Sequence, residues 1–596
     1  MCGFTGVVSF NEINSSLLEL SNRHSVCRGP DNLSNTKGFH DIYYDFWFNR
    51  LSIVDLSSEA NQPMNSQRTN SILMFNGEIY NSQYLRNKII KNKFDFQTSH
   101  SDTETLLAGL EVYGIEFIQK IDGQFSFIYF DKPNKKIFLG RDRLGQKPLY
   151  YKLDNKSLSF ASNLKSLLEL SHDLELDENS LHQYIRYGIN FTPNTLFTDF
   201  YKLNPGTYTV IDYSNNYLSK NEHIYWSPDE FVDNKKFNLN EFYSLFSEAV
   251  EKRMISDVPI ATFLSGGIDS TSIVKKLFDL DFKVNTFSVI VKNKKFNEKK
   301  YIDQVVNKYK TNHKDVIIDE NISNNLVLSA IKSLDEPYSD PSIVPTFFLS
   351  QLMSKDYKVA ISGDGGDELL GGYYRMKNHL KNKNIYKNSI SKLYKFYPTL
   401  FGTGTKFMSL SSNQINSYLA YLEDQKFSNK LFENEIEDNF KMKATNNNNI
   451  YKEILKCEYK YYLSNQMMFK VDRASMANSL EVRSPFVDHK LVEYVFSHST
   501  EYFDSNTQKY PLYNFLSSDF DQQFLKRPKQ GFIFDYRNWV FLNMKLIYEE
   551  IEKSKISKYL NTTYILNLQK IPSRVNALRI WKVFVLSVYL NDVNNL

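Results

Sequence analysis

The chain has 596 residues, a hydrophobic share of 42% and a formal net charge of +4. A chain of this length is too long for one ordinary hydrophobic core, so we expect two domains. The small net charge gives no electrostatic reason to expect a nucleic-acid partner. No stretch reaches ~18 uninterrupted apolar residues, so the sequence predicts no membrane-spanning helix.

Cysteine is rare in this chain, which contains only Cys2, Cys27 and Cys457. So small and odd a number does not form a disulfide framework and favours a reducing compartment. The N-terminus lacks a basic start followed by a long apolar run, so no signal peptide is predicted. We therefore expect a cytoplasmic protein.

Short strand-like runs bounded by turn signals fill the chain up to about residue 211. Asn76-Gly77 and Asp122-Gly123 are interpreted as turn dipeptides between such runs. This pattern predicts a strand-rich domain of sheet packed on sheet, and the polar stretch from 212 to 240 is interpreted as a linker. The runs are Gly6–Phe10, Ile72–Phe75, Phe125–Phe130 and Lys136–Gly140.

Strand-like and helix-like segments alternate after this stretch. Val258–Leu264 is a short apolar run of the kind found in buried parallel strands, and the helix-like run Thr271–Phe278 follows it. Such alternation predicts a doubly wound α/β domain. Beyond residue 370 or so the sequence is mostly helix-like. The remaining strand candidates are Val284–Val291, Asp315–Ile318 and Val359–Ser362, and Ile580–Leu590 is interpreted as a buried C-terminal helix.

The position of Cys2 raises the first functional question. If Met1 is removed, Cys2 carries both a thiol and a free α-amine. Because this amine titrates at about pH 8, it can serve as general base to its own side chain. Taken alone, a cysteine at position two is more often chance, so the rest of the chain decides its meaning.

Four ordered motifs follow Cys2, and the series resembles the class II (N-terminal nucleophile) glutamine amidotransferase domain. The resemblance covers residues 2–211 and implies an α+β sandwich of the N-terminal nucleophile type. It departs from the family at Cys27, where a histidine is frequent, and we expect Cys27 to be a packed thiol. The motifs are Arg50–Asp55, Asn76–Asn81, Ser101–Glu104 and Gly140–Tyr151.

The resemblance assigns roles that suit the chemistry of glutamine hydrolysis. An arginine fork matches the α-carboxylate of glutamine, which points to Arg50, and Asp102 would bind the α-ammonium with help from Glu78. The Asn76 side chain and the Gly77 N–H would stabilise the oxyanion formed when Cys2 attacks the amide. The implied glutamine-binding set is Arg50, Leu51, Ser52, Ile53, Val54, Asn76, Gly77, Glu78 and Asp102.

A glycine-rich turn follows the apolar run that ends at Leu264. Ser265–Ser270 leads from this strand into a helix, where backbone N–H groups and the helix dipole favour a phosphate. The turn is not a Walker A loop, because no Gly-Lys-Ser/Thr follows. It resembles the loop of N-type ATP pyrophosphatases, which cleave ATP between the α- and β-phosphates and leave AMP on the substrate.

Together with the later motifs, this half resembles the synthetase domain of glutamine-hydrolysing asparagine synthetase, which we expect over residues 240–596. Carboxylates in a glycine-rich loop at a strand end can hold Mg²⁺ against pyrophosphate. The later motifs are Phe287–Val289, Asp335–Pro337, Asp340–Ser342, Ser362–Glu368, Phe469–Ala477, Glu481–Phe486 and Arg527–Phe532.

This second resemblance also implies individual roles. Asp269 and Asp367 would bind Mg²⁺, and Asp364 occupies an acidic position important for forming the acyl-adenylate. Lys529 matches a lysine that stabilises charge as ammonia attacks and AMP leaves. The residues implied to bind ATP are Leu264, Ser265, Gly266, Gly267, Asp269, Ser270, Val289, Ser362 and Gly363.

The leading hypothesis is asparagine synthesis from glutamine, ATP and aspartate, with a shielded passage for ammonia between the two sites. The departure from the family at Ile533–Tyr536 lies near the acceptor side, so another carboxylate acceptor, such as a sugar acid, stays open. A catalytically silent scaffold predicts gaps in the catalytic set, and the sequence has none. No membrane or nucleic-acid partner is expected, and a homodimer is left open.

Overall fold

The structure is a computed structural model. It describes residues 2–92, 94–171, 173–232, 235–291, 298–318, 322–381, 396–404, 414–419, 422–432, 449–499, 507–527 and 534–595.

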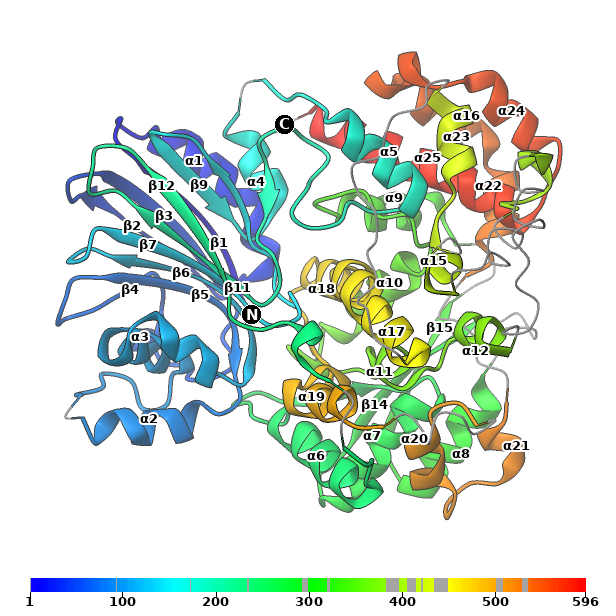
Figure 1. Cartoon of the computed structure of the whole chain (residues 1–596), viewed down its shortest axis with the longest axis horizontal. Helices are drawn as coiled ribbons and strands as arrows, with labels where there is room; N and C mark the ends of the chain where they lie inside the picture. The colour runs from blue at the N-terminus through cyan, green and yellow to red at the C-terminus, as the bar shows by residue number, and fades with distance from the viewer. Residues whose placement is uncertain are drawn as a thin grey trace.

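Two six-stranded antiparallel sheets pack face to face in the N-terminal part (Figure 1). One sheet has the order β10-β8-β9-β1-β3-β2 and the other the order β12-β11-β7-β6-β5-β4. Their strands are β1 (Cys2–Ser9), β2 (Asn32–Phe39), β3 (Tyr43–Arg50), β4 (Met64–Asn65), β5 (Ile72–Ile79), β6 (Gly123–Asp131), β7 (Lys136–Arg141), β8 (Tyr150–Leu153), β9 (Ser157–Ala161), β10 (Tyr201–Lys202), β11 (Thr207–Asp212) and β12 (Ser219–Ile224).

Alternating apolar residues of the two sheets form the core between them. Phe4 and Phe46 point inward from the first sheet and meet Ile128 and Phe130 of the second. Helices α1 (Ser15–Asn22) and α4 (Leu164–Glu169) pack on the outer side of the first sheet, and α2 (Ser82–Ile90) and α3 (Asp102–Tyr113) on that of the second (Figure 1). The expected α+β sandwich is confirmed.

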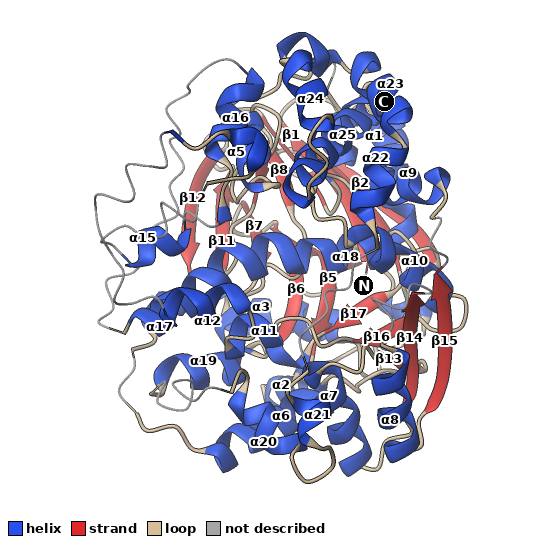
Figure 2. Cartoon of the chain, turned by 90° about the vertical axis from the view of Figure 1, so that its right-hand side faces the viewer, coloured by secondary structure: helices blue, strands red, loops and turns tan. Residues whose placement is uncertain are grey.

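The second half is built on a five-stranded parallel sheet of order β15-β14-β13-β16-β17, visible in Figure 2. Because chain order runs outward from β13 in both directions, the order reverses between β13 and β16. In doubly wound sheets, ligands bind at the carboxyl ends of the strands at such a switch point. The strands are β13 (Ile260–Phe263), β14 (Asn285–Val291), β15 (Asn312–Ile318), β16 (Val359–Ile361) and β17 (Glu481–Arg483).

Helices cover both faces of this sheet, as the alternating pattern predicted. On one face α10 (Ile343–Met353) and α18 (Met468–Met476) bury Leu349 and Val471 against the strands. On the other, α7 (Ile268–Asp279) and α8 (Lys299–Tyr309) belong to the largest apolar cluster. The expected α/β doubly wound architecture is therefore confirmed.

The C-terminal part is helical, and its longest helix is α25 (Arg574–Val593). This helix is buried around most of its circumference, which explains its lack of an amphipathic pattern and confirms the expected buried helix. The helices packed around it or nearby are α5 (Glu178–Tyr187), α9 (Asn324–Lys332), α16 (Gln425–Phe432), α22 (Tyr536–Leu542), α23 (Met544–Lys553) and α24 (Thr562–Gln569). The other α-helices of the described ranges are α6 (Leu239–Lys252), α11 (Gly366–Leu370), α12 (Tyr374–Lys381), α15 (Gln414–Leu419), α17 (Ile450–Cys457), α19 (His489–Ser497), α20 (Tyr510–Leu516) and α21 (Gln522–Leu525), and a π-helix over Glu458–Met467 joins α17 to α18.

The fold corrects four expectations. Asn76 and Gly77 are not a turn: they lie inside β5, where Gly77 allows close packing against Gln124 of β6. Asp122-Gly123 is not a turn either, because Gly123 is the first residue of β6. The stretch interpreted as a linker contains β12, whose exposed side chains fit its place at a sheet edge. Cys27 is exposed and not packed.

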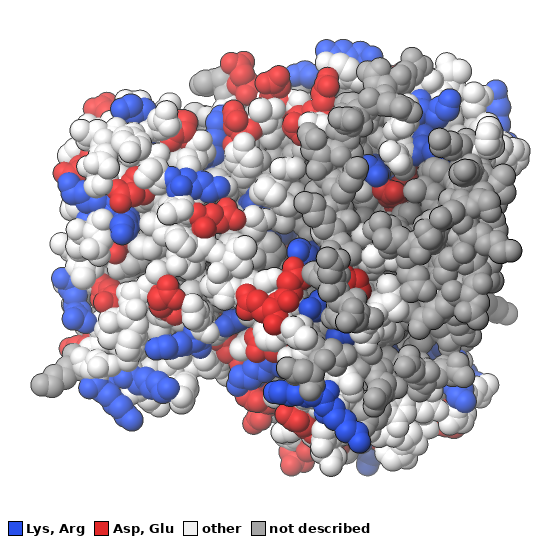
Figure 3. Space-filling model, in the orientation of Figure 1, with Lys and Arg blue, Asp and Glu red and all other residues white. Residues whose placement is uncertain are grey.

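All three cysteines are free. Within the described ranges, no helix is both long and apolar enough to cross a bilayer. Basic and acidic side chains are interspersed over the described part of the face in Figure 3, as the small net charge suggests.

Candidate active site

The N-terminal site lies where the two sheets of the sandwich meet. In the pairing of β1 with β3, Cys2 stands directly opposite Arg50. The Cys2 backbone N–H donates to Asn76 Oδ1 of the second sheet at 3.0 Å. The fold thus brings together three residues that lie far apart in the sequence.

The Cys2 side chain is buried and shielded from water. The residue is 6% exposed. Burial raises the pKa of the thiol, whereas the Leu51 amide and the Arg50 guanidinium act in the opposite direction. A thiol with a raised pKa needs a base to become a nucleophile near neutral pH.

In the part of the chain that the structure describes, Asn76 has an unused donor, and Gly77 packs closely against the neighbouring strand. Asn76 Nδ2 is buried and has no hydrogen-bond partner among the described residues, so this donor is available to a ligand. A Cβ on Gly77 would lie 2.1 Å from the Gln124 carbonyl oxygen, so only glycine fits at this position.

Arg50 is held by the loop that follows its own strand. Its Nη1 donates to the Ser57 carbonyl at 2.7 Å and to Asn61 Oδ1 at 2.8 Å, and its Nη2 donates to the Asp55 carbonyl. These bonds fix the guanidinium and leave part of its fork for a ligand carboxylate.

Two acidic side chains, Glu78 and Asp102, lie in the same region. The Ile79 N–H donates to Asp102 Oδ2 at 3.0 Å. Burial raises the pKa of Asp102 to about 6. Burial, and then the charge of Asp102, raise the pKa of Glu78 well above its usual range. A ligand ammonium would therefore be favoured here, because it compensates crowded carboxylates.

The loop over residues 51–54 packs against the second half. Leu51 and Ile53 contact Val359 of β16 and Met476 of α18. The Asp257 N–H donates to the Ile53 carbonyl at 2.9 Å. Elsewhere in the loop, the Ser52 N–H donates to Asp31 Oδ2 at 2.7 Å, and Val54 joins the same apolar cluster. Contacts with the second half therefore support the loop that the resemblance assigns to glutamine binding.

The glycine-rich turn after β13 forms a compact loop at the switch point. Gly266 has φ +67°, a conformation that favours glycine. The Gly267 N–H donates to Ser265 Oγ at 3.2 Å, and the Ser265 N–H to Ser270 Oγ at 3.2 Å. Leu264, which precedes the loop, donates its N–H to the Phe287 carbonyl of β14 at 2.8 Å.

The loop after β16 touches this first loop. A Cβ on Gly363 would lie 3.0 Å from the Asp269 Cβ. Ser362 is buried, and its Oγ has no partner in the described part of the chain. The two loops predicted to bind ATP therefore lie side by side. Val289 follows Ser288, whose Oγ donates to the Leu264 carbonyl, on the neighbouring strand β14.

The two predicted metal ligands face a cation that the sequence analysis missed. Lys509 Nζ contacts Asp269 Oδ2 and lies 2.7 Å from Asp367 Oδ1. Although burial acts against its charge, the two carboxylates raise the pKa of Lys509. A lone lysine at the start of a helix carries no sequence signal, so only the fold reveals it.

Of the two residues predicted to act on the acyl-adenylate, the structure describes Asp364 and not Lys529. Asp364 is half-buried, and its carbonyl accepts a hydrogen bond from Ser484 Oγ. Lys529 lies outside the described residues. In the departing segment, Asp535 is a helix cap that accepts from the Asn538 N–H at 3.2 Å.

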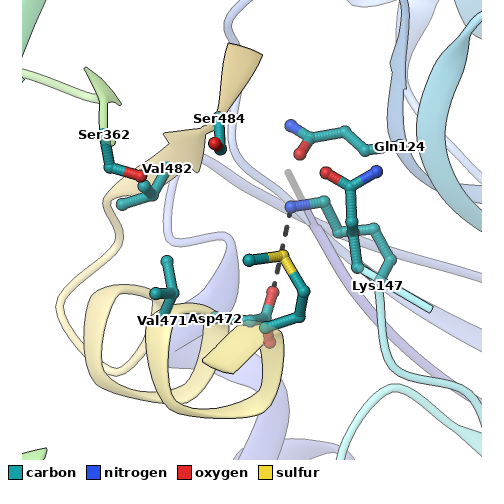
Figure 4. A pocket seen from close by; sticks show the side chains of 9 residues that line it. Gln124, Lys147, Ser362, Val471, Asp472, Val482 and Ser484 are labelled. Atoms are coloured by element: carbon teal, nitrogen blue, oxygen red, sulfur yellow. Dashed lines mark ion pairs between the residues drawn. The ribbon is translucent and has the colours of Figure 1, made fainter. Parts of the chain in front are cut away.

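A pocket lies between the two predicted sites (Figure 4). Ser362 of the ATP loop lines one part of it, and Gln124, which neighbours Gly77, lines another. Lys147 Nζ lies 4.0 Å from Asp472 Oδ1 in its wall, and burial lowers the pKa of Lys147 to about 8. The other lining residues are Gln146, Met468, Val471, Val482 and Ser484.

A buried ion pair and a buried hydrogen bond connect the two halves around this pocket. Arg28 forms a two-pronged pair with Asp472, with N–O distances of 2.9 and 3.1 Å. Arg473, which pairs with Asp335 of its own half at 2.9 Å, donates to Tyr150 Oη of the first half at 2.6 Å. These contacts fix the two walls of the pocket relative to each other.

Two protein-family models match the two halves of the chain. The model of the glutamine amidotransferase domain matches residues 1–226, and the model of asparagine synthase matches residues 241–590. The chain belongs to the asparagine synthase family. This membership makes it a ligase that uses ATP and glutamine for amide synthesis, with an N-terminal nucleophile domain that takes the nitrogen from glutamine.

Relatives in the family span most of the chain. Asparagine synthetase [glutamine-hydrolyzing] 1 of Bacillus subtilis is 29% identical and covers 99% of this chain and 96% of its own length. Putative asparagine synthetase [glutamine-hydrolyzing] 2 of Methanocaldococcus jannaschii is 32% identical over 66% of this chain and 79% of its own. A solved glutamine phosphoribosylpyrophosphate amidotransferase of B. subtilis is 13% identical, covering 61% of this chain and 81% of its own, and its TM-score of 0.28 carries no weight.

Proposed function

We propose that this family member makes asparagine from aspartate, with glutamine as nitrogen donor and ATP as activator. The observation that carries the proposal is the buried pocket, which adjoins both the Gly77 region and the Ser362 loop. The similarity to a relative named asparagine synthetase, over nearly the full length of both chains, supports aspartate as acceptor. We propose residues 2–211 as the glutaminase domain and 240–596 as the synthetase domain.

In the proposed glutaminase site, glutamine is held by Arg50 at its α-carboxylate and by Asp102 and Glu78 at its α-ammonium. After removal of Met1, the Cys2 nitrogen is a free amine, and its bond to Asn76 Oδ1 orients it. This amine takes the thiol proton, and the thiolate attacks the side-chain amide.

The resulting oxyanion is stabilised by Asn76 Nδ2 and the Gly77 N–H, a type of contact worth roughly 3–4 kcal/mol each. The amide nitrogen leaves as ammonia with the proton from the amine. Water then attacks the glutamyl thioester, which releases glutamate and restores the Cys2 thiol.

The released ammonia would reach the second site through the pocket between the halves. Ammonia is mostly protonated at neutral pH in water, and ammonium is not a nucleophile. A passage closed to solvent keeps the neutral form, and the Lys147–Asp472 side of the wall is buried.

In the proposed synthetase site, ATP lies on the Ser265–Ser270 and Ser362-Gly363 loops at the switch point. Asp269 and Asp367 suit Mg²⁺, because both already converge on the Lys509 ammonium and Mg²⁺ takes carboxylates together with phosphate oxygens. Bound there, Mg²⁺ would neutralise charge on the departing pyrophosphate.

The acceptor chemistry then needs two displacements. The β-carboxylate of aspartate attacks the α-phosphorus of ATP and expels pyrophosphate, near Asp364. Ammonia attacks the acyl carbon of β-aspartyl-AMP, AMP leaves, and the nitrogen loses a proton to give the neutral amide. We propose that Lys529 stabilises charge in this second step.

The test supplies purified protein with glutamine, aspartate, ATP and Mg²⁺. We expect asparagine, glutamate, AMP and pyrophosphate, and ADP in place of AMP would exclude adenylation. Glutaminase activity without aspartate-dependent pyrophosphate would assign another acceptor, and a sugar-acid panel would identify it. Cys2→Ala should lose glutamine use and retain synthesis from added ammonia, and the mass of the mature N-terminus reports on Met1.

A further inference from the structure

Strand β17 belongs to the ATP-binding half, yet its charged side chains reach into the glutamine site. Arg483 Nη2 lies 3.0 Å from Glu78 Oε2, and Arg483 Nε lies 2.6 Å from Glu481 Oε1. Gln124 Nε2 donates to the same Glu481 oxygen at 3.2 Å. Arg483 and Glu481 are both 0% exposed, and Glu78 is 2% exposed.

Glu78 needs a cation for physical reasons. It is a fully buried carboxylate whose ionised form is disfavoured by burial and by the nearby charge of Asp102, while Arg483 acts in the opposite direction. Without Arg483, the ionised form of Glu78 would be disfavoured further, and its carboxyl group would lose the partner that fixes its position. A neutral Glu78 attracts an ammonium group less, so the Arg483 contact bears directly on the ligand site.

Arg483 is itself held rigidly. Its Nη1 donates to the carbonyls of Arg253 at 3.0 Å and Ile255 at 2.5 Å. Its own carbonyl accepts the Ser362 N–H at 2.9 Å, at the start of the proposed ATP loop. A single residue thus connects the backbone of one site to a side chain of the other.

We propose that Arg483 is a positioning residue for glutamine: its buried contact with Glu78 fixes the orientation of that carboxyl group, so the ATP half completes the glutamine site. This inference rests on the proposed role of Glu78 beside the glutamine ammonium. It requires no movement of the chain. Its signature is an effect on glutamine affinity that leaves the chemistry of the ATP site intact.

The test compares Arg483→Gln with Arg253→Gln. Arg253 is a matched control: it is 2% exposed, and its guanidinium pairs with Asp488 at 3.1 Å and not with Glu78. The substitution keeps the backbone carbonyl that accepts from Arg483. In Arg483→Gln we expect KM for glutamine to rise about tenfold, with ammonia-dependent pyrophosphate release within about twofold of wild type. In Arg253→Gln we expect KM for glutamine to change less than about twofold. Equal loss of both activities in Arg483→Gln, or the same KM rise in the control, overturns the proposal.

A double-mutant cycle identifies the route of the effect. In a Glu78→Gln background, Arg483→Gln should change KM for glutamine less than about twofold, because the side chain on which it acts is gone. Independent, additive effects would overturn the proposal. If Arg483→Gln does not fold, Arg483→Lys with Arg253→Lys as control replaces it, since lysine keeps the cation but not the fork. The wild type and Cys2→Ala, run in the same assays, report separately on the proposed function.

Discussion

Replacing Lys509 by methionine removes the ammonium group that Asp269 and Asp367 share. The Lys509 side chain is 7% exposed, and the two carboxylates are 16% and 10% exposed. Removing one partner of a buried ion pair costs about 3–5 kcal/mol, and the partial exposure places this case near the lower end, at ~3 kcal/mol.

This free energy converts into a measurable shift. Unfolding entropy of about 2.1 cal/mol/K per residue gives roughly 0.7 kcal/mol/K for a unit the size of the match over residues 241–590. A loss of ~3 kcal/mol then lowers the unfolding midpoint of the ATP half by roughly 4 °C in EDTA. Because Mg²⁺ would take the place of the missing ammonium, it should restore most of the loss, and it should stabilise the variant more than the wild type.

The assay is thermal unfolding in EDTA and in Mg²⁺, without nucleotide. Lys275→Met is the matched control: Lys275 lies on the same helix as Asp269 and pairs with Asp519 at 2.7 Å, away from the two carboxylates. The control should respond to Mg²⁺ as the wild type does. If Lys509→Met unfolds at the wild-type temperature in EDTA, or gains no more from Mg²⁺ than the wild type, the reasoning on this cluster is wrong.

Three further changes probe the rest of the assembly. Asn76→Ala should lower glutaminase kcat by about 10²–10³ and leave ammonia-dependent synthesis unchanged, and parallel losses in both assays would argue against an oxyanion role. Since burial raises the pKa of Asp102 to about 6, its carboxylate is charged above that pH and neutral below it, so KM for glutamine should rise as the pH falls through 6. Asp102→Asn should show a high, pH-independent KM, and a variant that still follows pH would assign the titration to another group. Arg28→Met removes the two-pronged partner of the buried Asp472. Because Arg473 and Lys147 stay within 4.0 Å of that carboxylate, the loss in urea unfolding should lie near the lower end of the range for buried pairs, at about 3 kcal/mol, and adding Asp472→Asn should recover part of it.

Local patterns predicted most of the secondary structure for identifiable reasons. The apolar run ending at Leu264, with glycines after it, predicted a buried parallel strand and a loop, because a strand buried on both faces has no polar side. Asn76-Gly77 was interpreted wrongly as a turn. The dipeptide has the composition of a turn, but the neighbouring strand β6 leaves no room for a Cβ at Gly77, so the glycine serves close strand packing instead.

The sequence by itself determined the two-part architecture and the candidate chemistry, because motif residues stay in order along the chain and each catalytic role demands a particular side chain. Only the tertiary structure decided which residues share a site. Lys509 lies 240 positions from Asp269, and Arg483 lies 405 positions from Glu78. Neither pair leaves a local pattern, since these contacts arise from strand order and the packing of one half on the other. The pocket between the two sites has the same origin, because its walls come from both halves of the chain.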